Sequence, residues 1–382
     1  MKVISADFTP VTPYETEFLY IQGGQRYNVI VEMNQVCTPL NVFQINANLA
    51  QAPGAYFLRA ITQTGCGTAC ANNGMGLSNG IIEYEESCGA KPVPQANLTV
   101  VTSVCRDEYA NLSPFVPKGA GSVAKFNEVV KLMPAGNAGV TPFAQYGAIV
   151  RWFFGPLDNL NTNSASKKAN QTISVDFKQP TLKTLATLPD LAYNSSLYSN
   201  AVALTGPKND WVYFVIQNNF QTSHPMHLHG HDFAILGQGE GVFDSSMISA
   251  LKFDNPIRRD TALLFGAPVV VNGVPQTGPN APARSGYTVI GFKTDNPGAW
   301  VMHCHIIWHA DGGMGLQFIE RPDDIQADKY YGQPEFQNEC SAYENFEKAG
   351  GSGKLIYESG LKKRHLDAHK FHGFHAGSLA RH

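Results

Sequence analysis

Short runs that alternate between hydrophobic and polar residues recur along the chain, separated by segments rich in Gly, Pro and Asn. In the run 25–32, which follows two glycines, Tyr27, Val29 and Val31 fall on one face at the period of two that marks a β-strand. Runs of the same kind occupy positions 97–104, 211–217, 287–293 and 300–304. The pattern therefore predicts many short strands joined by turns, and it predicts no long amphipathic helix.

The composition favours an all-β, loop-rich protein. Only 15% of the 382 residues are charged, and 36 Gly and 23 Pro supply turn formers for two or three domains. Strands at this density are typical of Greek-key barrels or sandwiches. The net charge of −3 gives no basic surface for nucleic acid or an anionic membrane, and no apolar run approaches the ~18 residues of a membrane-spanning helix. We therefore expect neither nucleic acid nor a membrane as a partner.

Several features are typical of a secreted, extracellular protein. Four sequons for N-glycosylation are present, at Asn97, Asn111, Asn170 and Asn194. Four of the seven cysteines lie close together, at Cys66, Cys70, Cys88 and Cys105, as in loops stapled by disulfides. The first residues reach Asp7 too early to hold a signal-peptide core, so we expect the signal to lie upstream of this chain. The alternative is that the sequons arise by chance and the thiols are free.

Histidine is distributed very unevenly. All twelve histidines lie at or beyond position 224, and seven of them fall in the two blocks His224–His231 and His303–His309, the second of which also contains Cys304. A single histidine is more often a satisfied core residue than a metal ligand. Seven in two short blocks, with a cysteine among them, indicate a metal site rather than packing.

The second block can serve two sites at once. It follows Ala299–Met302, so it plausibly ends a strand, where Cys304 points to one face while His303 and His305 point to the other. His309 lies five residues beyond Cys304 and can curl back toward the cysteine sulfur. Met314 lies ten residues beyond Cys304.

These residue types match copper better than zinc. One thiolate, two imidazoles and a weak thioether form the ligand set of a blue-copper electron-transfer site, and His224 is the natural second imidazole. Structural zinc favours close Cys-x-x-Cys pairs, which are absent here. His227 and His229 lie two apart, so they can join His303 and His305 around a polynuclear cluster.

The motifs His-Pro-x-His-Leu-His-Gly-His and His-Cys-His-x-x-Trp-His-x-x-x-Gly-Met resemble two of the four copper signatures of multicopper oxidases. The flanks are similar to ascomycete-type fungal laccases, at Arg258–Thr261, Phe292–Trp300 and Gln317–Pro322. The opening segments Ala6–Phe8 and Gly24–Tyr27 resemble the second domain of that family. The resemblance runs from residue 1 to about Leu361.

The resemblance implies tandem cupredoxin-like (plastocyanin-like) Greek-key barrels and copper as cofactor. It assigns the type 1 copper to His224, Cys304 and His309 with Met314 axial, the type 2 copper to His227, and the type 3 pair to His229, His303 and His305. Cys304, His303 and His305 would carry electrons from phenolic small molecules to the cluster that reduces O2 to water. His231 matches a position that is not a ligand, and Asp232 is expected to orient a neighbouring imidazole.

The chain departs from the family in one respect. The family's trinuclear cluster takes eight histidines, four of them from the first domain, and no histidine precedes position 224 here. We therefore expect a second domain at 1–114, a third domain at 115–340, a tail at 341–382, and no first domain. Such a fragment would be inactive alone, and a monomer when complete. One alternative is a copper-binding electron-transfer protein without oxidase activity. A two-domain oxidase with clusters between subunits would still need His-x-His pairs in each chain.

The resemblance also implies pairings and processing. By family position Cys66 pairs with Cys105, and Cys340 is left unpaired because its family partner lies in the first domain. Cys70 with Cys88 is a further pairing that does not come from the resemblance, since the sequence alone does not choose among the fifteen pairings of six cysteines. Glu358–Leu361 resembles the end of ascomycete laccases, followed by basic residues, so cleavage after Leu361 is expected.

Overall fold

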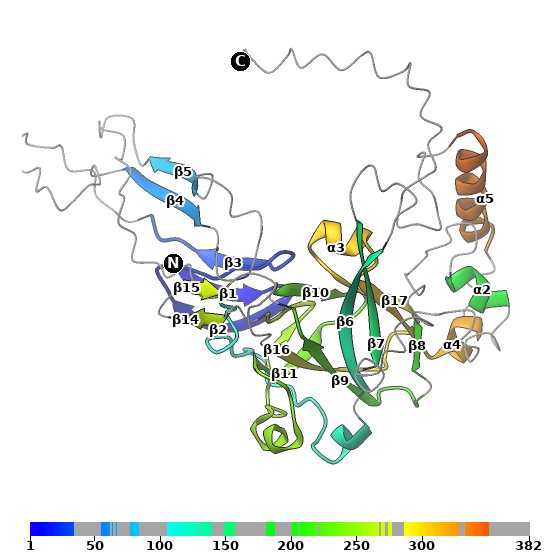
Figure 1. Cartoon of the computed structure of the whole chain (residues 1–382), viewed down its shortest axis with the longest axis horizontal. Helices are drawn as coiled ribbons and strands as arrows, with labels where there is room; N and C mark the ends of the chain where they lie inside the picture. The colour runs from blue at the N-terminus through cyan, green and yellow to red at the C-terminus, as the bar shows by residue number, and fades with distance from the viewer. Residues whose placement is uncertain are drawn as a thin grey trace, which may run out of the picture.

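The computed structural model describes residues 1–33, 55–61, 63, 66, 77–83, 105–128, 130–139, 149–156, 181–187, 201–204, 206–220, 222–266, 269–271, 274–276, 286–327 and 333–350. Strands make up most of the regular structure in these residues, and the N-terminal strands lie to one side of the larger sheets in Figure 1. The predicted all-β fold class is confirmed for the described part of the chain.

The N-terminal sheet is small and antiparallel. It contains β1 (Lys2–Ala6), β2 (Thr9–Glu15) and β3 (Tyr27–Ile30) in the order β2-β1-β3. A separate antiparallel pair consists of β4 (Ala55–Ile61) and β5 (Leu77–Glu83). The strand predicted within 25–32 is therefore present as β3.

Two larger sheets follow, in the orders β13-β10-β17-β18-β8 and β12-β11-β16-β9-β6-β7. Their strands are β6 (Val130–Gly139), β7 (Ile149–Pro156), β8 (Ala201–Leu204), β9 (Trp211–Asn218), β10 (His224–Leu228), β11 (Phe233–Glu240), β12 (Arg258–Arg259), β13 (Thr261–Leu264), β16 (Gly286–Lys293), β17 (Gly298–Cys304) and β18 (Gly315–Glu320). A further hairpin joins β14 (Val269–Val271) to β15 (Val274–Gln276). The strands predicted at 211–217, 287–293 and 300–304 are confirmed as β9, β16 and β17.

One hydrophobic core joins the larger sheets to the N-terminal sheet. Leu228 of β10, Phe292 of β16 and Phe318 of β18 are at most 2% exposed and belong to one cluster. Val3 and Ala6 of β1 pack in the same cluster. Because burial of one large aliphatic or aromatic side chain contributes about 1.5–3 kcal/mol, this shared core holds β1 against the strands that carry the histidines.

The described residues contain several short helices and one longer helix, none of which the sequence analysis predicted. The described helical segments are η3 (Lys125–Glu128), α2 (Thr181–Thr187), η7 (Ser245–Ala250), α3 (Ile307–Asp311), α4 (Pro322–Ala327) and α5 (Pro334–Lys348). The prediction of no long amphipathic helix is wrong, because α5 has 15 residues. Its apolar stripe is narrow: Cys340 is buried, whereas Phe336 and Tyr343 are only partly so. The pattern of hydrophobic residues therefore gave a weak signal.

The expected boundaries can be compared with the elements. Among the described residues, β1 to β5 lie before position 114, and every strand of the two larger sheets lies after it. The tail expected from position 341 begins inside α5, which continues to Lys348. The strand expected at 97–104, the Cys70–Cys88 pair and the cleavage site at Leu361 lie outside the described residues.

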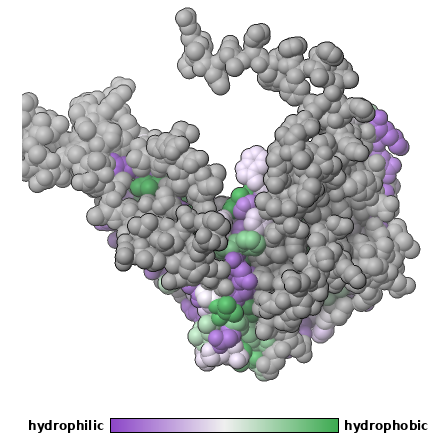
Figure 2. All heavy atoms as spheres, in the orientation of Figure 1, coloured by the Kyte–Doolittle hydropathy of each residue, from purple (hydrophilic) through white to green (hydrophobic). Residues whose placement is uncertain are grey.

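A membrane-spanning helix is absent from the described residues, because no helix there is both long and apolar enough. In the coloured part of Figure 2, hydrophilic and hydrophobic residues lie interspersed on the face shown.

Candidate metal centre

The two histidine blocks meet on adjacent strands. β10 and β17 pair antiparallel, with Met226 opposite Cys304 and His227 opposite His303. Because side chains of a strand alternate between its faces, Cys304 shares the core face with Met226, while both histidines point to the other face. Cys304 is fully buried and His303 is partly exposed. The alternation expected from the sequence is present.

On the core face, His224, Cys304 and His309 form what we call the buried group. The two Nδ1 atoms of His224 and His309 are 3.1 Å apart, and the Cys304 Sγ lies 3.7 and 3.8 Å from them. Helix α3 turns the chain back after β17 and so returns His309 to the cysteine. Nitrogen and sulfur ligands about 2.0–2.3 Å from one metal ion lie roughly 3.5–3.8 Å from one another in a trigonal array. The donor set therefore fits a soft or borderline metal such as copper.

Met314 lies beside this group through its backbone. The Cys304 N–H donates to the Met314 carbonyl at 3.0 Å, and the Met314 N–H donates to the His309 carbonyl at 2.8 Å. Met314 is fully buried in the same core cluster as Cys304. The fold thus brings together all four residues that the sequence analysis assigned to one site.

Burial sets the protonation of the buried group when no metal is bound. It raises the pKa of the Cys304 thiol to about 12, although an N–H from Ile306 to the sulfur opposes this. Burial also lowers the pKa of His224 to about 3 and lowers that of His309. Near pH 7 the group is thus a neutral thiol beside two neutral imidazoles. Because thiolate is the form that binds metals, metal binding must displace the thiol proton.

On the opposite face, His227, His229 and His303 form what we call the open group. Their ligand atoms all lie within 4.8 Å of one another, and the Nε2 atoms of His229 and His303 are 3.2 Å apart. Nδ1 of His303 donates to the carbonyl of Cys304 at 2.9 Å, which leaves Nε2 as its metal-facing atom. His305 stands farther off, with its ring centroid 5.9 Å from those of His227 and His303.

The acceptor that orients His227 is Asp260, which the sequence analysis named only as part of the family-like flank Arg258–Thr261. Nδ1 of His227 donates to the Asp260 carbonyl at 2.8 Å, and the Asp260 carboxylate lies 3.8 Å away. Burial alone would raise the pKa of Asp260, but hydrogen bonds from Arg26 and neighbouring positive charge outweigh it and hold that pKa below its usual range. The prediction for Asp232 is wrong, because its largely exposed side chain lies 3.9 Å from Arg258 instead of on an imidazole.

A loop of the N-terminal sheet reaches His305. Gly24 has a positive φ of 81°, and a Cβ built on it would lie 2.4 Å from the ring of His305. Glycine is needed here both for the backbone conformation and for the close approach of the imidazole. The sequence marked Gly24 as a turn residue and gave no sign of its contact with a histidine.

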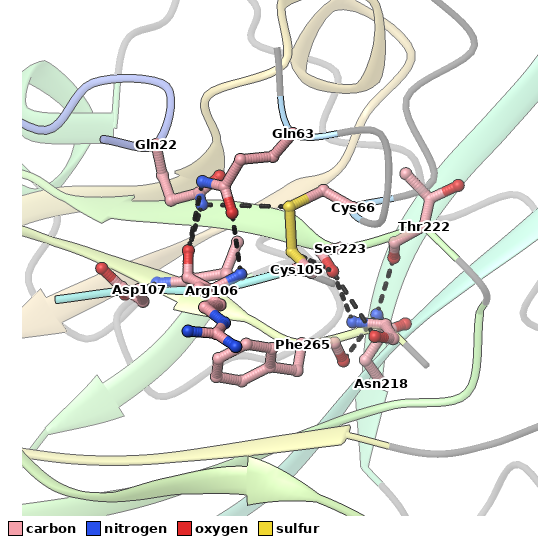
Figure 3. The surroundings of a disulfide bond; sticks show 12 residues. Gln22, Gln63, Cys66, Cys105, Arg106, Asp107, Asn218, Thr222, Ser223 and Phe265 are labelled. Atoms are coloured by element: carbon pink, nitrogen blue, oxygen red, sulfur yellow. Dashed lines mark hydrogen bonds between the residues drawn. A yellow bond between two sulfur atoms is a disulfide. The ribbon is translucent and has the colours of Figure 1, made fainter. Parts of the chain in front are cut away.

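The Cys66–Cys105 disulfide is present, as the family position implied. Figure 3 shows that it lies beside Ser223, whose N–H donates to the Cys66 carbonyl at 3.1 Å and whose Oγ is 3.3 Å from the Cys105 sulfur. Ser223 directly precedes His224, so the disulfide supports the start of β10. Cys340 is buried and unpaired among the described residues.

Trp152 of β7 covers the imidazoles of the buried group. Its ring centroid is 4.6 Å from that of His309 and 5.4 Å from that of His224, and the backbone N–H of Trp152 donates to the Gly312 carbonyl at 2.9 Å. Nothing in the local sequence distinguishes this tryptophan from a core residue, since the contact depends on how β7 packs against α3.

His231, expected not to be a ligand, lies away from both groups. Its Nε2 is 2.8 Å from the Glu320 carboxylate, and both side chains are almost completely buried. Its ring centroid lies 4.6 Å from that of Phe292, with the two rings tilted relative to each other. The histidine thus connects the end of the first block to β18 and β16.

The chain is similar to several known proteins. Two family models, both described as multicopper oxidase, match residues 1–87 and 174–324. Laccase-3 of Botryotinia fuckeliana is 34% identical over 333 residues, which cover 83% of this chain and 59% of that protein. Dihydrogeodin oxidase of Aspergillus terreus is 31% identical over 363 residues, which cover 91% of this chain and 51% of that protein.

Among solved structures, the laccase from Botrytis aclada superposes with a TM-score of 0.66 at 29% identity, covering 94% of this chain and 54% of that one. The match confirms the predicted tandem cupredoxin-like architecture. The chain spans little more than half the length of each of these three proteins. The two family models and the shared fold show that the chain belongs to the multicopper oxidase family, whose members bind copper.

Proposed function

We propose that the buried group holds a type 1 copper, with His224, Cys304 and His309 as ligands and Met314 in the axial position. The observation that carries this is the convergence of two Nδ1 atoms and one thiol sulfur within 3.8 Å, at the end of a strand in the core. No described cation or hydroxyl competes for the sulfur, whose only hydrogen bond from the described backbone comes from Ile306.

We further propose that His227 contributes to a type 2 copper, and His229, His303 and His305 to a type 3 pair. Three of these imidazoles already lie within ligand range of one another, and His305 lies on the same face. The family's cluster takes twice this number of histidines, so this chain would supply half of it.

The proposed activity is that of a laccase-type oxidase. Phenolic small molecules would be oxidised one electron at a time, coupled to reduction of O2 to water, in an extracellular protein that is monomeric when complete. Copper, when bound, supplies the one-electron chemistry. The chain supplies the connection: Cys304 is covalently joined to both His303 and His305, and the hydrogen bond from His303 Nδ1 to the Cys304 carbonyl adds a second link between the two faces.

The buried group makes the proposal testable with this chain alone. Loaded with Cu(II), the chain should show the intense visible absorption of a copper–thiolate bond, and one copper per chain should be bound with Cys304 as ligand. A colourless copper complex with an unreacted, titratable Cys304 thiol would overturn the type 1 assignment.

A second candidate is a copper-binding electron-transfer protein without oxidase activity. It is favoured by the number of imidazoles on this face: His227, His229, His303 and His305 are half of the eight that the family's cluster takes. The two candidates differ in O2 uptake. Phenol-dependent O2 consumption by the copper-loaded protein supports the oxidase, whereas reversible reduction and oxidation of one copper without O2 consumption supports the electron-transfer protein.

A further inference from the structure

Arg26 connects the N-terminal sheet to the segment that orients His227. It lies directly before β3, and its guanidinium binds both carboxylate oxygens of Asp260, with Nη1–Oδ1 and Nη2–Oδ2 distances of 2.7 Å each. Asp260 lies between β12 and β13, more than 230 residues farther along the chain. A two-pronged arginine–carboxylate pair fixes direction as well as distance, because both groups are planar.

The guanidinium is held in place from its own side. The Arg26 N–H donates to the Asp7 carboxylate at 2.8 Å, and the Arg26 carbonyl accepts from the Asp7 N–H at 2.7 Å. Nη1 also donates to the Gly24 carbonyl at 2.9 Å, and the guanidinium lies over the Phe8 ring at 4.8 Å. The side chain therefore reaches Asp260 in one defined orientation.

On the other side, Asp260 passes this orientation to His227. Its carbonyl accepts the Nδ1 proton of His227 at 2.8 Å, and its carboxylate accepts from the Thr261 hydroxyl at 3.0 Å. That hydroxyl also lies 3.2 Å from Nδ1 of His227. Asp260 thus contacts the imidazole by two routes, both of which keep the proton on Nδ1 and leave Nε2 for a metal.

Adhesion of the two sheets does not explain the Arg26 contact. That role belongs to the neighbouring Arg259, which is 1% exposed and donates to the Asp7 carboxylate at 2.9 and 3.2 Å and to the Tyr27 hydroxyl at 2.7 Å. The Arg26 side chain is 42% exposed, and ion pairs this accessible contribute little to stability. The Arg26–Asp260 pair is nevertheless well aligned, with two hydrogen bonds of 2.7 Å, so it fixes the orientation of Asp260 although it adds little stability.

We propose that Arg26 is a positioning residue for the open group: by fixing Asp260 it sets the tautomer and direction of the His227 imidazole. A residue of the N-terminal sheet therefore controls metal affinity at strands β10 and β17. The inference rests on the proposed role of His227 as a ligand. Partners that hold the second nitrogen of a metal-binding histidine typically change metal affinity 10–100-fold when removed.

The test uses zinc as a colourless probe in a Cys304→Ser background, where the buried group lacks its thiolate. Zinc affinity is measured by competition with a chromophoric chelator, and nitrogen-15 NMR reports which nitrogen of His227 carries the proton. We compare Arg26→Gln, Arg26→Lys and the control Arg106→Gln, which removes a positive charge that stacks on Tyr20 instead of binding Asp260.

We expect Arg26→Gln to weaken zinc binding roughly tenfold or more and to mix the tautomers of His227. Arg26→Lys keeps the charge but not the fork, so its zinc affinity should fall in between. Arg106→Gln should match the parent. Parent-like affinity and tautomer in Arg26→Gln, or equal losses in Arg26→Gln and Arg106→Gln, would overturn the proposal.

Failure of the proposed function has a different signature. It would appear as parent-like zinc affinity in His227→Ala with Arg26 intact, because His227 would then not be a ligand of the open group. If Arg26→Gln and Arg106→Gln unfold at similar temperatures, any loss of zinc affinity in Arg26→Gln comes from positioning. If zinc affinity falls only in proportion to the fraction of unfolded protein, the positioning role of Arg26 is refuted.

Discussion

On one face of β10 and β17 the buried group gathers a thiol and two imidazoles among core side chains, whereas on the opposite face the open group presents imidazoles alone, with His229 exposed. The same tripeptide, His303 to His305, serves both faces. What differs is the surroundings: the buried group is enclosed by Trp152 and the core, and the open group is oriented by polar partners such as Asp260.

The difference teaches that ligand type follows burial. A thiol can be kept neutral in the core until a metal arrives, because burial raises the pKa of Cys304. Imidazoles tolerate a partly exposed site, and hydrogen bonds to their second nitrogen set their direction. One strand pair can therefore build two centres of different chemistry.

The largest expected effect comes from removing the sulfur. Cys304→Ser should abolish the copper–thiolate absorption completely, while metal binding at the open group remains. Cys340→Ser is the matched control, because Cys340 is the other buried, unpaired cysteine among the described residues. Optical titration with Cu(II) provides the measurement. A blue serine variant, or loss of colour in both variants, would contradict the ligand assignment.

The second largest difference is expected in the number of protons that each group releases when it binds a metal. The Cys304 thiol has a pKa of about 12, and His224 is already neutral above a pKa of about 3. The pKa of His309 is also lowered, so between about pH 7 and 12 both imidazoles are neutral and copper binding to the buried group should release one proton. Its affinity should then rise about tenfold per pH unit.

At the open group the pKa values of His229 and His303 are lowered, chiefly by burial, so these imidazoles need to release little or no proton near pH 7. Calorimetry in buffers of different ionisation enthalpy counts the protons for each group. Equal proton release from the intact chain and from Cys304→Ser would refute the distinction.

Gly24→Ala should disturb the face of the open group, through His305, and leave the buried group unchanged. Alanine in a left-handed conformation costs about 1–2 kcal/mol. Gly241→Ala shares that cost, because Gly241 has a φ of 97°, and no described atom lies within 4 Å of the place its Cβ would take. Only Gly24→Ala also displaces His305. We expect similar losses in unfolding free energy, with shifted His305 imidazole resonances in the first variant only. Unshifted resonances in Gly24→Ala would show that the contact has no influence.

The smallest effect is expected at Met314. Replacing its thioether in Met314→Leu should keep the blue colour and raise the reduction potential modestly, since an axial thioether stabilises the oxidised copper. Redox titration of parent and variant measures the change. A lower or unchanged potential in the leucine variant would argue against an axial role.

Much of this could be predicted from the sequence because the decisive signals are local. The alternation of a strand fixes which of His303, Cys304 and His305 share a face, and five residues are enough for His309 to return through α3. The motifs themselves carried the family resemblance and the assignment of Met314.

What could not be predicted depends on pairing between distant strands. Asp232 was expected to orient a neighbouring imidazole because a metal-bound histidine needs an acceptor on its other nitrogen. Instead, β13 pairs with β10 and places Thr261 opposite His227, which brings Asp260 to the imidazole. The contact of Gly24 with His305 crosses from one sheet to another. A single sequence contains no register for such pairings.

The register of β10 and β17 also has a consequence for how the protein matures. Met226, Leu228, Met302 and Cys304 are each at most 3% exposed, and Met226 pairs with Cys304 as Leu228 pairs with Met302. A slip of one residue would turn the thiol outward and bury the imidazoles. It would also expose these hydrophobic neighbours, so their burial favours the observed register. His224 and Cys304 are 80 residues apart, and contacts of that separation slow folding because a long loop must close first. Strand alignment therefore decides which face of the sheet carries the sulfur.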